Sequence, residues 1–160
     1  LGQLKGIGAV TLVLTLKHSL LNDIYWLNVG SGDFPFLAVV QHTNLVNSSC
    51  YAKENIVYVG NYLETSHRYF NLTESQLLDE FEPYLKKVNA DFKRSWVKKA
   101  EVFKTGFAQP IITLNYSKKL PLLRTPIAGV YLANIQQVYP WDRGTNYAVE
   151  LGEKVAELIE

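Results

Sequence analysis

The chain has 160 residues with 16 basic and 15 acidic side chains, which gives a formal net charge of +1 at pH 7. This length suits one ordinary domain, with or without an extra arm, and the low charge excludes binding to nucleic acid or to an anionic membrane through a strong charge field. The single cysteine, Cys50, excludes an intramolecular disulfide framework, and the three histidines form no pair at helical spacing, so no metal site is predicted.

The first part of the chain predicts four strands separated by short connections. Apolar and β-branched residues alternate over Ile7–Leu16, which is typical of a strand covered on both faces. Shorter strands are predicted over Ile24–Val29, Phe36–Gln41 and Asn55–Leu63. Because connections of this length hold no crossovers, the pattern predicts hairpins and an antiparallel sheet.

A helix is predicted over Glu74–Val88, on one face of the sheet. Thr73 and Gln76 have the spacing of a capping box, and an apolar stripe follows them. Pro83 lies inside this segment and is predicted to kink the helix or to end its first half, because proline removes a backbone hydrogen bond.

The rest of the chain predicts further strands and a second helix. The strands span Ser95–Thr105, Gln109–Tyr116 and Gly129–Asn134, and the helix spans Tyr147–Glu160. The predicted fold class is therefore α+β, a mainly antiparallel mixed sheet with one or two covering helices and a C-terminal strand–helix arm.

The C-terminal helix has the most informative pattern in the chain. Three small residues, Ala148, Gly152 and Ala156, lie four apart along the edge of its apolar stripe. The stripe alone fits an amphipathic helix that closes a core. The polar segment Asp142–Asn146 in front of the helix instead favours a ligand site, because the free amides and the positive end of the helix dipole attract anions and carbonyl oxygens. The stripe is formed by Ala148, Leu151, Gly152, Val155, Ala156 and Ile159.

This strand, loop and Ala-x-x-x-Gly-x-x-x-Ala helix resemble the C-terminal end of FAD-dependent amine oxidoreductases, in particular the protoporphyrinogen-oxidase-like and UDP-galactopyranose-mutase-like branches. The resemblance implies that residues 1–125 form a substrate-binding domain and that residues 126–160 return to a dinucleotide-binding domain, where the start of the helix faces the flavin. Many relatives carry an acidic residue where this chain has Asn134. The implied cofactor-binding residues are Asn134, Asp142, Arg143, Gly144, Thr145 and Asn146.

The resemblance also implies a part of the enzyme that this sequence does not contain. No Gly-x-Gly-x-x-Gly loop follows a predicted strand, although such a loop binds the pyrophosphate of FAD. The sequence begins with Leu1 and has no methionine, which indicates a piece of a longer chain. We therefore expect the parent protein to be the enzyme and to bind FAD together with its N-terminal dinucleotide-binding domain. The piece alone is expected to be inactive and to bind no FAD.

Two further expectations concern association and location. An apolar helix stripe without its packing partner predicts self-association through the C-terminal arm. The sequence shows no secretory signal and no apolar run long enough to span a bilayer, which indicates a cytoplasmic location.

Four side chains are candidates for substrate binding: His42, Tyr62, Gln109 and Gln136. A lone histidine at a strand end is more often structural, and aromatic residues on alternating strands are more often part of a core, so both interpretations stay open. No catalytic residue is identified, because in a flavoenzyme the flavin carries the difficult chemistry. The reaction is either dehydrogenation of a C–N or C–C bond or a flavin-dependent sugar isomerisation. The alternative is a non-enzymatic α+β module that binds an apolar ligand.

Overall fold

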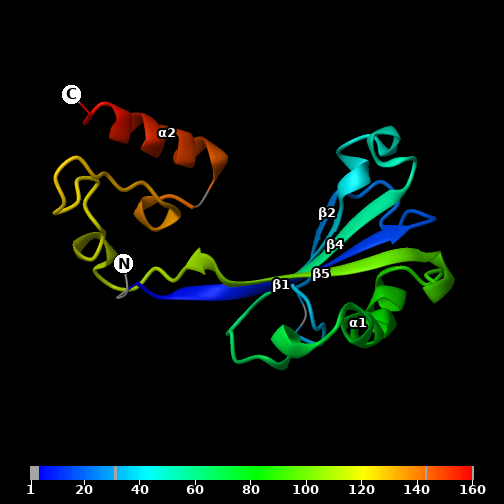
Figure 1. The fold of residues 1–160 in the computed structure, drawn as a ribbon. Coiled ribbons are helices and arrows are strands. Elements are labelled where there is room, and N and C mark those ends of the chain that lie inside the picture. The colour runs from blue at the N-terminus through cyan, green and yellow to red at the C-terminus, as the bar shows by residue number, and fades with distance from the viewer. Residues whose placement is uncertain (1–3, 31, 143, 160) are drawn as a thin grey trace. The chain divides into compact units, whose positions relative to one another are not determined.

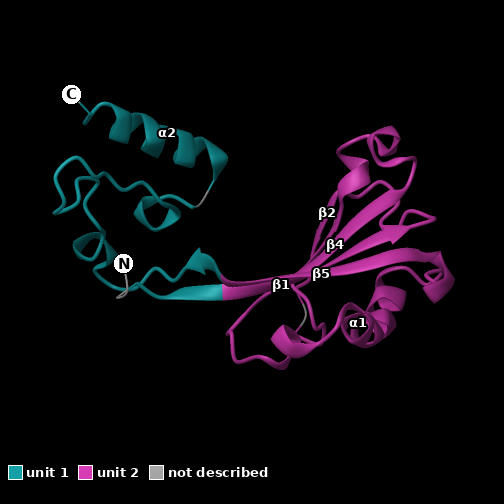
Figure 2. Ribbon diagram, viewed as in Figure 1, with its two compact units in different colours: residues 1–7, 107–160 teal, residues 8–106 magenta. Residues whose placement is uncertain are grey.

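A computed structural model describes residues 4–30, 32–142 and 144–159 of the chain. The chain forms two compact units: residues 1–7 and 107–160 belong to unit 1, and residues 8–106 belong to unit 2 (Figure 2). The division predicted at residue 125, between a substrate domain and a cofactor-domain arm, is a statement about function and stays a prediction. The α+β class is confirmed, because an antiparallel sheet is combined with separate helices (Figure 1).

The sheet has five strands. β1 (Gly6–Leu16) lies between β4 and β5, and it pairs antiparallel with β4 from Gly8 opposite Leu63 to Leu16 opposite Asn55. β3 pairs antiparallel with both β2 and β4. The order across the sheet is β2 (Trp26–Asn28), β3 (Ala38–Gln41), β4 (Asn55–Leu63), β1 and β5 (Val97–Pro110).

The pairing of β1 with β5 is antiparallel as well. In unit 2 the amide of Lys17 donates to the carbonyl of Trp96 over 2.9 Å, and in unit 1 the amide of Ile111 donates to the carbonyl of Lys5 over 2.9 Å. Residue numbers therefore rise along one strand while they fall along the other, which confirms the predicted antiparallel arrangement.

The helix α1 (Glu74–Val88) begins and ends where the sequence predicts. Both hydrogen bonds of the capping box are present: the amide of Gln76 donates to Thr73 Oγ1 over 3.3 Å, and the amide of Thr73 donates to Gln76 Oε1 over 2.9 Å. The helix does not end at Pro83, which lies inside it. Phe81 and Leu85 on either side of Pro83 are fully buried, so their burial outweighs the one backbone hydrogen bond that proline removes.

The apolar core of unit 2 lies between α1 and one face of the sheet. Alternate residues of β1 point into it, and the intervening residues are only half-buried on the opposite face. This period of two is the pattern that predicted the strand. The core includes Val10, Leu12, Leu14 and Leu16 of β1, Val57 and Val59 of β4, Leu77, Leu78, Phe81 and Leu85 of α1, and Phe36 and Phe92 from connections.

The strand predicted over Gln109–Tyr116 is wrong. β5 is longer than the predicted strand Ser95–Thr105 and continues through Gln109 to Pro110. Proline has no amide hydrogen for a ladder, and Asn115 turns the chain in the left-handed conformation with φ 58°. A short 3-10 turn, Tyr116–Lys118, follows in place of the strand.

The strand predicted over Gly129–Asn134 is also wrong. Gly129 has φ +76°, and the segment turns back so that the amide of Thr125 donates to the carbonyl of Val130 over 3.1 Å. A single β-bridge joins Arg124 and Tyr131. A strand needs a continuous ladder, and this turn supplies only one bridge. The helix α2 spans Thr145–Ala156, so it begins two residues before the predicted start and ends at Ala156 rather than Glu160, because Glu157 and Leu158 form a turn.

Candidate functional site

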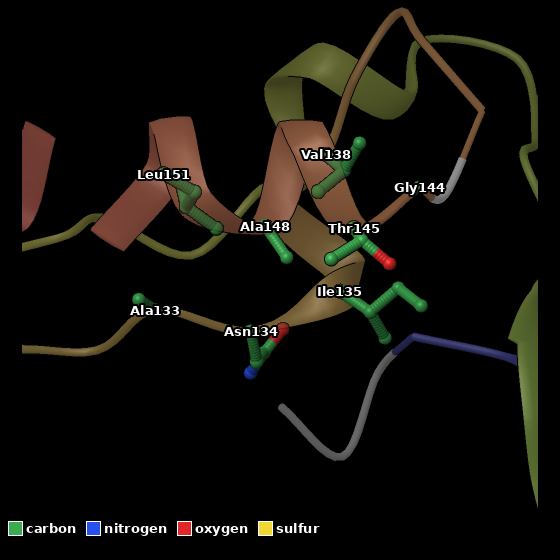
Figure 3. Close-up of a pocket in the computed structure, with 8 residues that line it drawn as sticks. All are labelled: Ala133, Asn134, Ile135, Val138, Gly144, Thr145, Ala148 and Leu151. Atoms are coloured by element: carbon green, nitrogen blue, oxygen red, sulfur yellow. The ribbon is translucent and has the colours of Figure 1, made fainter. Parts of the chain in front are cut away.

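A cavity of about 420 Å³ in unit 1 opens at the N-terminus of α2. One wall is the first two turns of α2, with Thr145, Ala148 and Leu151, and the other is the segment before the 3-10 turn Ile135–Gln137. Figure 3 shows α2 above this segment, with Thr145 and Ala148 on the side of the helix that faces Ile135. The cavity is lined by Ala133, Asn134, Ile135, Val138, Gly144, Thr145, Ala148 and Leu151.

The N-cap position of α2 supplies no capping side chain. Its N-cap residue is Gly144, which has no side chain to accept a hydrogen bond from the first-turn amides, and the first turn carries no acidic residue. The first amides of a helix have no acceptor within the helix, and the dipole places partial positive charge beside them. An oxygen atom or an anion in this cavity therefore meets a favourable electrostatic environment.

The chain beyond the other end of α2 is held by side chains of unit 1. Tyr131 donates its hydroxyl to the carbonyl of Leu158 over 3.0 Å, and Arg124 Nη2 donates to the same oxygen over 3.2 Å. Near the start of the helix, Trp141 stacks on Tyr147 with a ring-centroid distance of 5.9 Å and an interplanar angle of 3°. Both ends of α2 are thus tethered within unit 1, while its first-turn amides receive no side-chain cap from Gly144.

Only some of the predicted cofactor-binding residues line this cavity. Gly144, Thr145 and Asn134 do, whereas Asn146 is an exposed residue outside the lining. Asp142 is exposed and lies beside Gln109 at a separate small hollow. Arg143 lies outside the described residues.

Asn134 has a structural role that its predicted role did not include. Its Oδ1 accepts a hydrogen bond from the amide of Gln136 over 2.9 Å, and its own amide donates to Gln137 Oε1 over 2.8 Å. These bonds form the capping box of the 3-10 turn. In Figure 3 the side chain lies on the side of its segment away from α2, so in this arrangement Asn134 shapes the cavity through its backbone.

Polar side chains organise the small core of unit 1. Tyr116 is fully buried, and its hydroxyl donates to the carbonyl of Gln136 over 3.0 Å, while burial raises its pKa. Gln137 is buried and donates to the carbonyl of Pro121 over 3.1 Å. Among the described residues, the side-chain oxygen Oε1 of the half-buried Gln136 has no hydrogen-bond partner.

A second cavity, of about 370 Å³, lies in unit 2 on the face of the sheet opposite α1. It contains two of the predicted substrate-binding residues, His42 and Tyr62, while Gln109 and Gln136 belong to unit 1. The cavity is lined by Ala9, Thr11, Tyr25, Trp26, Leu37, Ala38, Val40, His42, Tyr58, Gly60, Asn61 and Tyr62.

His42 is fixed by aromatic neighbours. Its Nε2 lies 2.7 Å from the hydroxyl of Tyr51, and its ring packs edge-on against Tyr51 and Tyr58 with centroid distances of 5.2 and 5.7 Å. His42 therefore has a structural role among these rings and also lines the cavity, while its role in substrate binding stays a prediction.

Sequence reasoning missed two residues that shape this second cavity. Gln41 is fully buried, and its Oε1 accepts hydrogen bonds from the amides of Leu20 and Leu21 over 2.9 and 3.4 Å, which anchors the strand end from which His42 continues. Gly60 lies in the interior of β4 and adds no side chain to the cavity. A glycine inside a predicted strand is the signal that points to such a site.

The described residues hold no group of three or more His, Cys, Asp or Glu side chains that would bind a metal ion. Among the helices of the described chain, none is long and apolar enough to cross a membrane. No protein-family model matches the chain, and no curated protein matches it at a significant level.

Proposed function

We propose that this chain is the substrate-binding and cofactor-capping part of an FAD-dependent oxidoreductase of the amine-oxidase type. The observation that carries the proposal is the cavity of about 420 Å³ at the N-terminus of α2, where the N-cap residue is Gly144. It supports the role that the resemblance implies for Gly144 and Thr145, which both line this cavity. Asn146 and Asp142 do not line this cavity, so their part in cofactor binding rests on the resemblance alone.

The residues fit one end of the cofactor. The volume lies at the lower end of the range of small-molecule pockets, about 300–1,000 Å³, so it suits the edge of a ring system rather than a whole dinucleotide. The described residues offer no glycine-rich phosphate loop, which the N-terminal domain of the parent would provide. When bound, FAD supplies the redox chemistry.

Residues of this chain would stabilise negative charge on the bound ring and would surround it with apolar surface. The first-turn amides of α2 would stabilise negative charge at the edge of the cavity. Ile135, Val138 and Leu151 line the same cavity with apolar surface, which would displace water once a ring covers the cavity and would then strengthen that interaction. Within this proposal the reaction is a dehydrogenation of a C–N or C–C bond or a flavin-dependent sugar isomerisation, and a cytoplasmic location belongs to the same proposal.

Substitution Gly144→Val in the parent protein tests the proposal. A Cβ atom at Gly144 would lie 2.6 Å from Asn146 Oδ1, so the exposed Asn146 side chain must turn aside, and a branched side chain at Gly144 would crowd the approach of the flavin to the backbone there. We expect the flavin content per protein, measured by absorbance, to fall clearly. Thr145→Ala and Asn146→Ala should each cost no more than one hydrogen bond, about 0.5–1.5 kcal/mol of binding free energy.

The matched control is Gly32→Val, because nothing lies within 4 Å of the Cβ position at Gly32 in unit 2. This variant should keep its flavin and its circular dichroism spectrum. Equal flavin content in Gly144→Val and the unmodified parent, with both proteins folded, would contradict the assignment.

The second candidate is a non-enzymatic module that binds an apolar ligand, and the cavity of unit 2 favours it, because its lining is mostly apolar and aromatic. The two candidates differ in a simple observation. The parent of a flavoenzyme should purify yellow and lose its colour on Gly144→Val, whereas the parent of a binding module should purify without flavin.

A further inference from the structure

The open face of the sheet in unit 2 has a row of small residues at its centre. Gly60 of β4 lies opposite Thr11 of β1 on one side and opposite Ala38 of β3 on the other. Three neighbouring strands therefore carry Thr, Gly and Ala side by side, and these three residues all line the cavity of about 370 Å³. The missing side chain at Gly60 thus creates a depression in the face of the sheet.

Aromatic side chains border this depression. Tyr58 and Tyr62 lie two positions before and after Gly60 on the same face of β4, which separates their Cα atoms by about 13 Å along the strand. Trp26 on the edge strand β2 is 53% exposed although it lines the cavity. Its Nε1 donates to Asn28 Oδ1 over 2.8 Å, so the indole has its polar atom satisfied and its ring surface available.

The lining carries no Asp, Glu, Lys or Arg side chain. Its polar side chains are partly engaged within the protein: Asn61 donates to the carbonyl of Pro35 over 3.0 Å, and His42 Nε2 is bonded to Tyr51. A charged ligand would lose its hydration here without gaining an ion pair. Flat aromatic surface, in contrast, gains from stacking on the bordering rings and from contact with the small residues of the floor.

We propose that this cavity binds an uncharged, planar aromatic ring system, which lies on the Thr11–Gly60–Ala38 floor and stacks against Trp26 and Tyr62. The identification of this ring as part of the substrate rests on the proposed function, whereas the binding itself does not require flavin. Because all lining residues belong to unit 2, binding depends only on this unit.

The test is a binding titration of the 160-residue chain, without flavin, with the neutral fluorescent arylamine N-phenylnaphthylamine. Gly60→Leu fills the floor of the cavity. A Cβ atom at Gly60 meets only Thr11 Oγ1, at an ordinary 3.5 Å, so the backbone accepts a side chain at this position. We expect the dissociation constant to rise about ten-fold or more.

Thr15→Leu is the matched control, because Thr15 lies on the same half-buried side of β1 as Thr11 and outside the cavity lining. It should leave the dissociation constant unchanged. Trp26→Ala should weaken binding about two- to ten-fold by removing one stacking surface, and Trp26→Phe should restore most of it. The sulfonated analogue of the probe should bind more weakly than the neutral probe, because the lining offers its charge no partner.

Equal binding by Gly60→Leu and the unmodified chain, or preference for the sulfonated analogue, would overturn the proposal. Circular dichroism shows whether Gly60→Leu is folded, and Gly60→Ala, which adds a single methyl group, gives a graded second measurement of the same effect. Loss of flavin from the parent on Gly144→Val is a separate result, so failure of ring binding and failure of the flavin assignment are distinguishable.

Discussion

Unit 2 and unit 1 differ in how their described residues are stabilised. Every residue of the main apolar core lies in unit 2, between Val10 and Phe92. In unit 1 the buried apolar residues of the described chain include Tyr116 and Val138, and α2 contains no buried residue. Large side chains such as Leu122, 79% exposed, and Ile159, 60% exposed, remain in contact with solvent there.

This difference shows which part of the chain carries its own folding free energy. Buried apolar surface is the main favourable term in folding, and unit 2 has it between a sheet and a helix. Unit 1 relies more on hydrogen bonds, such as those of Tyr116, Asn134 and Gln137, whose net contributions are smaller. Such a unit gains most from a partner that covers its apolar surface.

The largest expected effect is on the core of unit 2. Phe81 is 1% exposed and packs edge-on against Phe36 and Tyr69, with centroid distances of 5.1 and 5.6 Å. Phe81→Ala should lower the free energy of unfolding by about 3–5 kcal/mol, as measured by chemical denaturation. Ile159→Ala, on the exposed side of unit 1, should change it by less than about 0.5 kcal/mol. Similar losses for the two variants would remove the distinction between the units.

The second prediction concerns association through α2. Leu151 and Val155 lie on its apolar stripe and are only half-buried. If the stripe packs against a second copy of the chain, each such side chain contributes about 1 kcal/mol, less than the full burial of an exposed side chain, because part of its surface is already covered. Leu151→Gln with Val155→Gln should therefore shift the molar mass measured by light scattering toward the monomer.

The control for this experiment is Val149→Gln, which removes an exposed apolar side chain of α2 outside the stripe. It should leave the molar mass unchanged. If the unmodified chain is already monomeric at high concentration, self-association is contradicted. The apolar stripe of α2 would then be expected to pack against another domain of the parent protein.

The third prediction tests the hydrogen bonds of unit 1. Tyr116→Phe removes the donor to the carbonyl of Gln136 and should cost about 1 kcal/mol. Burial raises the pKa of Tyr116 above its ordinary value of 10.0. The neutral hydroxyl therefore makes its full contribution to the stability of the folded state below pH 10, and this contribution is lost as the pH rises through the higher pKa of the folded state. The difference in stability between the two proteins should therefore shrink in strong alkali. A difference that grows with pH would reverse the sign and contradict the assignment.

The smallest effect is expected at the surface of unit 2. Glu82 Oε1 lies 2.7 Å from Lys86 Nζ, and its Oε2 lies 3.2 Å from Arg94 Nη1. The pKa of Glu82 lies below 4.5, mainly because its carboxylate accepts a hydrogen bond from Lys86. Burial acts in the opposite direction, and a hydrogen bond from Arg94 lowers the pKa further. The ionised carboxylate of Glu82 therefore makes its full contribution to the stability of the folded state above pH 4.5. This contribution is lost as the pH falls through the lower pKa of the folded state.

Glu82→Gln should accordingly cost no more than about 1 kcal/mol at neutral pH, and the cost should vanish in acid. Thermal unfolding at pH 7 and at pH 3 measures both values. Glu74→Gln, at the other end of α1, serves as a comparison because no salt bridge of the described residues involves Glu74.

The sequence by itself determined the local elements of unit 2. Residue spacing alone predicted the strands β1 and β4, through their alternation of apolar residues, and the start of α1, through the Thr73–Gln76 capping box. These features depend only on residues close in sequence. The same holds for the existence of α2, whose stripe has the helical period. A local pattern is sufficient where both the backbone hydrogen bonds and the buried face are set by residues close in sequence.

Only the tertiary structure decided the parts that depend on distant residues. It placed Tyr131 in a turn rather than a strand, since a ladder requires a partner that the pattern does not name. It gave Asn134 a capping role, separated Gln109 and Gln136 from His42 and Tyr62 into different units, and aligned Gly60 with Thr11 and Ala38. Strand register is set by packing across the whole sheet, and a cavity exists only where several such registers meet, so neither follows from the period of a single segment.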